Sequence, residues 1–346
     1  MGIREQLHAF WSGQRPEQIP YTIYYGAVQY AAGDPTWEAL YKSGLGVTCY
    51  RPTFAVTYHN VTFDAEAYTQ DGKEFLRRIQ RTPVGEIDAV WINGWHSKYW
   101  VETPADYRVM NYIAAHTEIV PDYVVYTAFE AELPEWVVAI PVIGRTPLQT
   151  ILVDYVGLEN FGVHLFEYAE EVHTLYNTLR NVFQRVVEIV AEGPGFYVSN
   201  LENFTAETLG PRRYQQFLLP VYEECFEILH NAGKIVGSHY DGRTKVCREQ
   251  IARAPIDLIE SLTPPPEGDQ TLAECRAAWP DKLFWSNINI ACYDLPPTAL
   301  KATVLDRVQE ATADGTKFAF EVSEDLPAQW RTALPIVLDA LKETHV

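Results

Sequence analysis

One histidine and two glutamates in this chain stand at the ends of short apolar runs, where they could take part in chemistry. His239 follows the run KIVGS, Glu260 follows IDLI, and Glu321 interrupts FAFEV. An unpaired carboxylate beside apolar residues is costly, so each glutamate is expected to bind a ligand or a partner such as an arginine. Neutral imidazole and carboxylate oxygens can together hold Zn²⁺ with one position left open. The pattern predicts a zinc site formed by His239, Glu260 and Glu321.

Further polar side chains follow two of these runs. Glu202 and Asn203 come after GFYVSNL, and Tyr240 and Asp241 come directly after His239. We assign Glu202, Asp241 and Tyr240 to acid catalysis and Asn203 to substrate binding. Simpler interpretations stay open, because His239 could be a hydrogen-bonded structural histidine and Glu202 could cap the segment that follows it.

Aromatic residues are numerous, with 9 Trp, 21 Tyr and 15 Phe. They either fill a large core or line a pocket for an apolar or aromatic ligand. The segment Trp91–Trp100 (WINGWHSKYW) could be a hairpin with a packed aromatic face or a lid that touches substrate. We predict substrate contacts from Trp95 in this segment and from Tyr24 and Asn287 near strand ends. Glu324 is interpreted as the start of a loop or a helix cap.

The elements that must position these residues are short apolar runs that alternate with helical patterns. Strands at such spacing need crossover helices and imply a parallel sheet. Eight such units predict a TIM (β/α)8 barrel over residues 1–346, with an open doubly wound sheet as the alternative. In a TIM barrel the active site lies at the carboxyl ends of the strands, where the residues above fall. The expected strands centre near residues 23, 49, 140, 197, 236, 260, 285 and 320. The main expected helices cover residues 147–154, 164–192, 211–232, 243–253, 271–279, 297–314 and 328–342.

Residues 55–135 interrupt this alternation and are rich in Tyr, Trp, Thr and charged residues. Their pattern predicts hairpins around 84–85 and within 88–99, followed by a helix over 104–116. We interpret the segment as a cap or lid inserted after the second strand and lying over one barrel mouth, within a single barrel domain.

Charge and composition exclude several classes of partner. The formal charge is 27 − 46 = −19, which disfavours nucleic acid and anionic membrane surfaces. The number of cysteines, five, is odd, and no two of them form a CxxC motif, so reduced thiols are expected. The first residues lack the apolar core of a secretory signal, and no run reaches the roughly 18 apolar residues of a membrane helix. A cytoplasmic location is therefore expected.

Three motifs, in order along the chain, resemble the uroporphyrinogen decarboxylase superfamily. Residues 82–86 (TPVGE) resemble its TPVG hairpin, and LEN at 201–203 followed by PRRYQQFLLP at 211–220 resembles its acidic pair and Y-x-x-F-x-x-P helix. Residues 233–242 (GKIVGSHYDG) resemble its G-x-x-V-x-x-H-x-C-G strand. The similarity covers most of the chain from about Val84 on. It implies a TIM barrel that carries out either decarboxylation or methyl transfer linked to a corrinoid or to methionine.

The decarboxylase branch of this superfamily carries an arginine-rich motif, M-R-Q-A-G-R, for its polycarboxylate substrate. Residues 21–30 of this chain (YTIYYGAVQY) stand in that place and contain no arginine. An acidic chain without these arginines is a poor host for a porphyrinogen with eight carboxylates. A porphyrinogen is therefore disfavoured as the substrate.

The methyltransferase branch holds Zn²⁺ with His-x-Cys and a later Cys. His239 matches the histidine, Asp241 replaces the first Cys, and Glu321 or Ser323 stands near the last. A zinc ion with nitrogen and oxygen ligands is a stronger Lewis acid, suited to polarising an ether oxygen. The resemblance thus implies an O-demethylating methyltransferase, with an aryl methyl ether as one donor and a corrinoid on a separate small protein as the acceptor. Glu202 or Tyr240 would assist the departing oxygen.

Two other functions remain as alternatives. One is a metal-independent decarboxylase or lyase of the same barrel, acting on a less anionic substrate with Asp241 or Glu202 as the acid. The other is a binding or sensor barrel without turnover, since a fold does not by itself determine chemistry. The oligomeric state is open, and a homodimer is one option.

Overall fold

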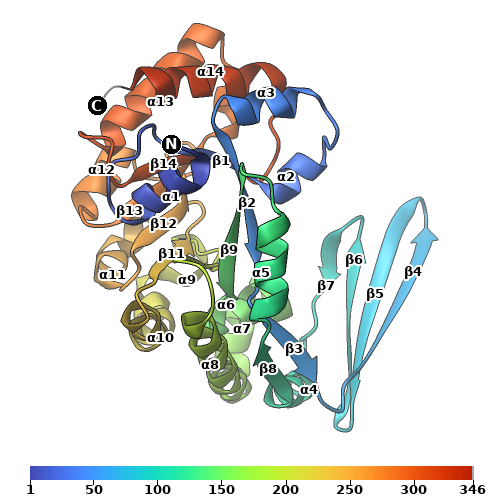
Figure 1. The fold of residues 1–346 in the computed structure, drawn as a ribbon. Helices are drawn as coiled ribbons and strands as arrows, with labels where there is room; N and C mark the ends of the chain where they lie inside the picture. Colours follow the sequence, from blue (N-terminus) through green and yellow to red (C-terminus); the bar gives the residue numbers. More distant parts are fainter. Residues whose placement is uncertain (345–346) are drawn as a thin grey trace. The chain divides into compact units, whose positions relative to one another are not determined.

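Eight parallel strands form a closed barrel in the computed structural model, which describes residues 1–344. Around the barrel they follow the order β1-β14-β13-β12-β11-β10-β9-β2 (Figure 1). The predicted (β/α)8 barrel is confirmed, and the open sheet is wrong because β1 pairs with both β2 and β14. Each strand lies where an apolar run predicted one. The strands are β1 (Tyr21–Tyr24), β2 (Leu45–Arg51), β9 (Val137–Gly144), β10 (Tyr197–Asn200), β11 (Ile235–His239), β12 (Leu258–Leu262), β13 (Leu283–Ile288) and β14 (Phe318–Val322).

The barrel strands are apolar because both of their faces are buried. In β9, for example, VVAIPVI is buried throughout. The parallel register aligns the carboxyl ends of neighbouring strands, with His239 opposite Glu260 and Asn287 opposite Glu321. Polar residues near the ends of separate apolar runs are thereby brought to one end of the barrel.

The helices that follow the later strands confirm most of the sequence prediction. The region expected as one helix over 211–232 consists of α9 (Ala206–Arg213), the π-helical segment η2 (Tyr214–Leu218) and α10 (Leu219–Asn231). Pro220 has no N–H to donate to the preceding turn, which accounts for the change of helical register there. Gly233, with φ of 75°, ends α10 as expected. The other helices here are η3 (Lys245–Cys247), α11 (Arg248–Arg253), α12 (Leu272–Ala278), η4 (Ile290–Asp294), α13 (Pro297–Ala311) and α14 (Trp330–Glu343).

A short helix that the sequence did not predict, α1 (Ile3–Trp11), packs against the amino-terminal ends of the strands. Its apolar side chains join a core cluster with Leu258 and Leu283, the first residues of β12 and β13. The Trp11 ring stacks on Tyr197 with centroids 4.8 Å apart. This packing closes the amino-terminal end, so the polar residues near the carboxyl ends face the other barrel mouth. The early part of the barrel unit also holds α2 (Tyr25–Gln29), α3 (Thr36–Lys42) and α5 (Tyr123–Glu132).

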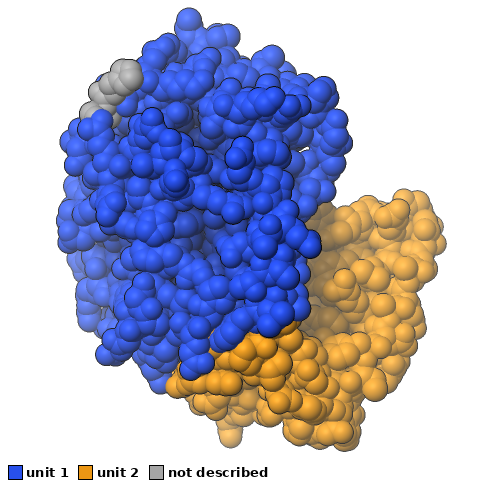
Figure 2. Space-filling view, viewed as in Figure 1, with its two compact units in different colours: residues 1–53, 123–144, 190–346 blue, residues 54–122, 145–189 orange. Residues whose placement is uncertain are grey.

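The chain forms two compact units, which Figure 2 colours separately. Unit 1 contains the barrel, and unit 2 consists of residues 54–122 and 145–189. The hairpins predicted at 84–85 and 88–99 and the helix at 104–116 are confirmed. The sequence analysis did not predict that β4 and β5 belong to the same sheet. Unit 2 has an antiparallel pair, β3 (Phe54–Tyr58) with β8 (Thr117–Pro121), and a sheet of β4 (Thr62–Gln70), β5 (Lys73–Thr82), β6 (Gly85–Ile92) and β7 (Trp95–Lys98). Its helices are α4 (Pro104–Ala115), α6 (Pro147–Gln149), η1 (Thr150–Val156), α7 (Leu158–Glu167) and most of α8 (Ala169–Glu192).

Side-chain contacts explain why the segment after β9 joins unit 2. Tyr107 Oη lies 3.0 Å from His164 Nδ1, and Thr178 Oγ1 donates to Asn111 Oδ1 at 2.6 Å. The ring of Tyr99 lies against Gly157, where an added Cβ would be only 2.4 Å from a ring carbon. Hydrophobic periodicity predicts the helices in this segment but not these partners. The chain therefore leaves the barrel unit after β9 as well as after β2.

Within residues 1–344 no helix is long and apolar enough to cross a membrane. No disulfide joins the five cysteines, four of which are buried.

Candidate active site

Four alternate strands contribute polar side chains to one place inside the barrel. In the ring, β2, β10, β12 and β14 are alternate strands, which supply a common layer of side chains in a TIM barrel. Glu260 of β12 accepts hydrogen bonds from the hydroxyl of Tyr50 on β2 and from Ser199 Oγ on β10, the latter at 2.9 Å. Glu321 of β14 accepts a hydrogen bond from the backbone N–H of Ser261 at 2.9 Å. The layer therefore holds two carboxyl groups, both almost fully buried.

The charge of Glu260 affects the ionisation of Glu321. Burial, and then the negative charge of Glu260, raise the pKa of Glu321 well above its usual value. One Glu321 oxygen, Oε2, is buried without a hydrogen-bond partner of ordinary geometry. A protonated carboxyl explains this arrangement, since two buried charges this close would repel. The raised pKa favours the protonated form of Glu321 over that of an ordinary surface glutamate.

Tyrosines surround this pair. Burial raises the pKa values of Tyr24, Tyr50 and Tyr197, and the charge of Glu260 or Glu321 raises them further. All three hydroxyls therefore stay protonated and can donate hydrogen bonds. The Tyr24 and Tyr50 rings lie with centroids 5.6 Å apart and planes tilted by 44°.

A small pocket of about 270 Å³ opens beside this layer. The side chains of Tyr24, Tyr50, His239 and Glu260 line it, so three residues predicted from sequence are brought together here. Glu324 and the exposed Tyr30 also line it. The volume lies below the roughly 300 Å³ at which typical ligand pockets begin, so a bound ligand would be small.

His239 lies between the buried layer and solvent. Its side chain is 9% exposed, and its Nε2 is 3.6 Å from an oxygen of Glu324, whose side chain is 68% exposed. The sequence pattern predicts a loop or cap role for Glu324 and does not indicate this contact with His239. The contact forms because the chain that follows β14 brings Glu324 next to His239.

Glu202 and Tyr240, predicted as catalytic, belong to a separate buried network. Tyr222 donates to Glu202 at 2.9 Å, and Tyr240 donates to Tyr222 at 3.3 Å. The hydroxyls of Tyr214 and Tyr240 are 2.7 Å apart. Neither predicted residue lines the small pocket. The network satisfies a buried carboxylate among tyrosines, which is what a structural role requires.

The other predicted residues lie in different surroundings. Asn287 is buried and donates to Ser261 Oγ at 2.7 Å and Thr263 Oγ1 at 3.1 Å. Asn203 has a left-handed backbone, with φ of 53°, and Asp241 is exposed just after β11. Trp95 is 81% exposed in the β6–β7 hairpin of unit 2. None of these four is among the residues that line the pocket.

The predicted zinc ligands do not form a ligand set in this conformation. Both oxygens of Glu260 already accept hydrogen bonds, and Ser261 N–H occupies one oxygen of Glu321. Within residues 1–344 no three His, Cys, Asp or Glu side chains lie together as a metal site would require. His239, Glu260 and Glu321 would have to rearrange to hold zinc.

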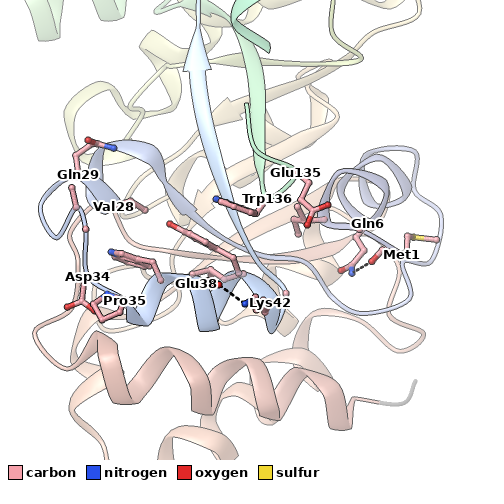
Figure 3. Close-up of a pocket in the computed structure, with 18 residues that line it drawn as sticks. Met1, Gln6, Val28, Gln29, Asp34, Pro35, Glu38, Lys42, Glu135 and Trp136 are labelled. Atoms are coloured by element: carbon pink, nitrogen blue, oxygen red, sulfur yellow. Dashed lines mark hydrogen bonds and ion pairs between the residues drawn. The ribbon is translucent and has the colours of Figure 1, made fainter. Parts of the chain in front are cut away.

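A larger cavity, of about 890 Å³, lies near the amino-terminal ends of β2 and β9 (Figure 3). Its wall includes Met1, Glu38 and Trp136, and Lys42 pairs with Glu38 at 2.6 Å. Ligand sites of TIM barrels lie at the opposite end, so size alone does not make this cavity the active site.

Comparison with models of protein families and with curated protein sequences gives no match for this chain.

Sequence reasoning missed Tyr50, Ser199 and Tyr197, which complete the surroundings of the carboxyl pair. A signal for them was present, because strands were predicted near 49, 197, 260 and 320. Applying the alternate-strand rule to those strands would have placed Tyr50 and Ser199 near Glu260 and Glu321.

Proposed function

We propose that this chain is a methyltransferase that takes a methyl group from a small methylated donor in the pocket beside Tyr24, Tyr50 and Glu260. The acceptor would be the cobalt of a reduced corrinoid on a separate protein, as the family resemblance implies. The observation that carries the proposal is the buried Glu260–Glu321 pair, in which the pKa of Glu321 is raised, beside a pocket whose volume suits a small donor.

Demethylation of an ether requires a proton for the departing oxygen, and the carboxyl pair would supply it. As the methyl–oxygen bond breaks, its electron pair stays on oxygen, and the new methyl–cobalt bond uses an electron pair of the reduced acceptor. The oxygen becomes basic and takes the proton of Glu321, relayed through Glu260, which lines the pocket, leaving a neutral alcohol or phenol and a carboxylate. Tyr50 and Ser199 hold Glu260 in place and stabilise its charge. In this proposal the carboxyl pair assists the departing oxygen in place of zinc and of Glu202 or Tyr240.

The lining of the pocket favours methyl transfer over decarboxylation. Among the described residues that line it, none is lysine or arginine, while Glu260 and Glu324 are acidic. A substrate carboxylate would be repelled by these side chains and would find no cationic partner other than His239. The methyl donor needs no negative charge.

The test is a methyl-transfer assay with the full chain, 2-methoxyphenol and chemically reduced cob(I)alamin, followed by the absorbance change on formation of methylcobalamin. We expect Glu321→Gln, which keeps shape but cannot release a proton, to slow transfer by about 100-fold or more. Glu343→Gln, at an exposed ion pair with Lys301, is the matched control and should leave the rate unchanged. Equal rates for the two variants would contradict the assigned acid. Release of carbon dioxide from 2-hydroxybenzoate without a corrinoid would favour the decarboxylase.

A further inference from the structure

Two features of the pocket point to the charge of its ligand. The first is its aromatic wall, in which the rings of Tyr24 and Tyr50 meet at 44° and Tyr30 adds a third ring at the rim. A cation within about 6 Å of such ring faces is attracted to their negative π-clouds.

The second feature is the excess of acidic groups. Glu260, which is fully buried, and Glu324, whose side chain is largely exposed, both line the pocket. Among the described lining residues, His239 is the only one that can become positively charged, and it already faces Glu324. Glu260 is fully buried, so solvent screens its field weakly. A neutral ligand would not be attracted by the negative charge of these carboxylates.

We propose that this pocket binds small organic cations of the quaternary ammonium class. The statement that this cation is also the methyl donor rests on the proposed function. Tyrosine rings would surround the methyl groups, and Glu260 and Glu324 would balance the charge. A quaternary ammonium has no N–H, which suits a pocket whose inner carboxylate already receives its hydrogen bonds from Tyr50 and Ser199.

The transfer step balances for such a donor. The nitrogen–methyl bond breaks with its electron pair remaining on nitrogen, so the cation becomes a neutral tertiary amine. The methyl group bonds to the reduced corrinoid through an electron pair of the cobalt.

The test compares choline with 3,3-dimethylbutan-1-ol, a neutral molecule of nearly the same shape, by calorimetric titration of the full chain at constant ionic strength. We expect choline to bind at least about tenfold more tightly. Glu324→Gln, at an exposed position that folding should tolerate, is expected to weaken choline binding severalfold and to leave the neutral alcohol unaffected. Tyr24→Leu should weaken choline more strongly, and Glu343→Gln serves as the control.

Each result has one meaning. Equal affinities for the two ligands, or no binding of either, would overturn the inference. Selective choline binding without methyl transfer to cob(I)alamin would support the ligand class and contradict the proposed methyltransferase. Transfer from 2-methoxyphenol without any preference for choline would support the enzyme and contradict the cation.

Discussion

Glu260 and Glu321 lie on strands separated by one other strand, and each contributes a buried carboxyl group to the same layer of the barrel. Glu260 receives two side-chain hydroxyl donors, whereas Glu321 receives one backbone N–H, and its other oxygen has no hydrogen-bond partner of ordinary geometry. The two carboxyl groups therefore differ in their hydrogen-bond partners, and burial together with the charge of Glu260 raises the pKa of Glu321.

The pH dependence of stability should reveal this raised pKa. The pKa of Glu321 is raised in the folded chain, so between its unfolded and folded pKa values only the folded state keeps the proton. The stability contributed by this group therefore falls as pH rises through that window, by up to about 1.4 kcal/mol per pH unit. In Glu321→Gln this loss should be absent. Urea unfolding of both chains from pH 5 to pH 8 measures it, and parallel curves would contradict the raised pKa.

The pH dependence of the proposed activity has the same sign. The acid form of Glu321 is present below its folded pKa and lost above it. We expect the rate of methyl transfer to fall as pH rises through that value. A rate that increases over the same range would show that Glu321 does not act as the acid.

Removing the Tyr50 hydroxyl should destabilise the barrel. Tyr50→Phe takes one of two hydroxyl donors from the fully buried Glu260, at an expected cost of about 1–3 kcal/mol. Tyr30→Phe is the matched control, because Tyr30 is 84% exposed and should change stability by less than about 0.5 kcal/mol. Urea unfolding compares the two, and similar midpoints would mean that the Tyr50 contact contributes little.

Tyr240 offers a test between catalytic and structural roles. Its hydroxyl bonds to Tyr214 and Tyr222 in the buried network and does not line the pocket. We expect Tyr240→Phe to cost about 1 kcal/mol of stability and to change kcat by less than threefold. Loss of more than 100-fold in kcat in a chain that unfolds at the same urea concentration as the parent would restore the catalytic assignment.

Zinc content can be measured directly. Because the predicted ligands already bind other groups, we expect elemental analysis of chain purified without chelators to find far less than one zinc per chain. His239→Ala should leave that content unchanged. One zinc per chain that His239→Ala removes would show that the ligands rearrange around a metal, as the family resemblance implies.

The sequence by itself determined the barrel and the approximate place of its chemistry. Buried parallel strands must be apolar on both faces, so the eight runs were visible, and polar residues at their ends identified His239, Glu260 and Glu321. Periodicity is a local property, and it was sufficient for most barrel helices as well.

The tertiary structure alone decided which of these groups act together. Tyr50 and Glu260 are 210 positions apart in the chain, and only closure of the barrel joins them. The same closure drew Glu202 and Tyr240 into a network with Tyr214 and Tyr222, away from the pocket. Side-chain contacts likewise hold the helices after β9 in unit 2. The physical reason is that ionisation, hydrogen bonding and packing depend on distances in space, which residue order along a strand does not specify.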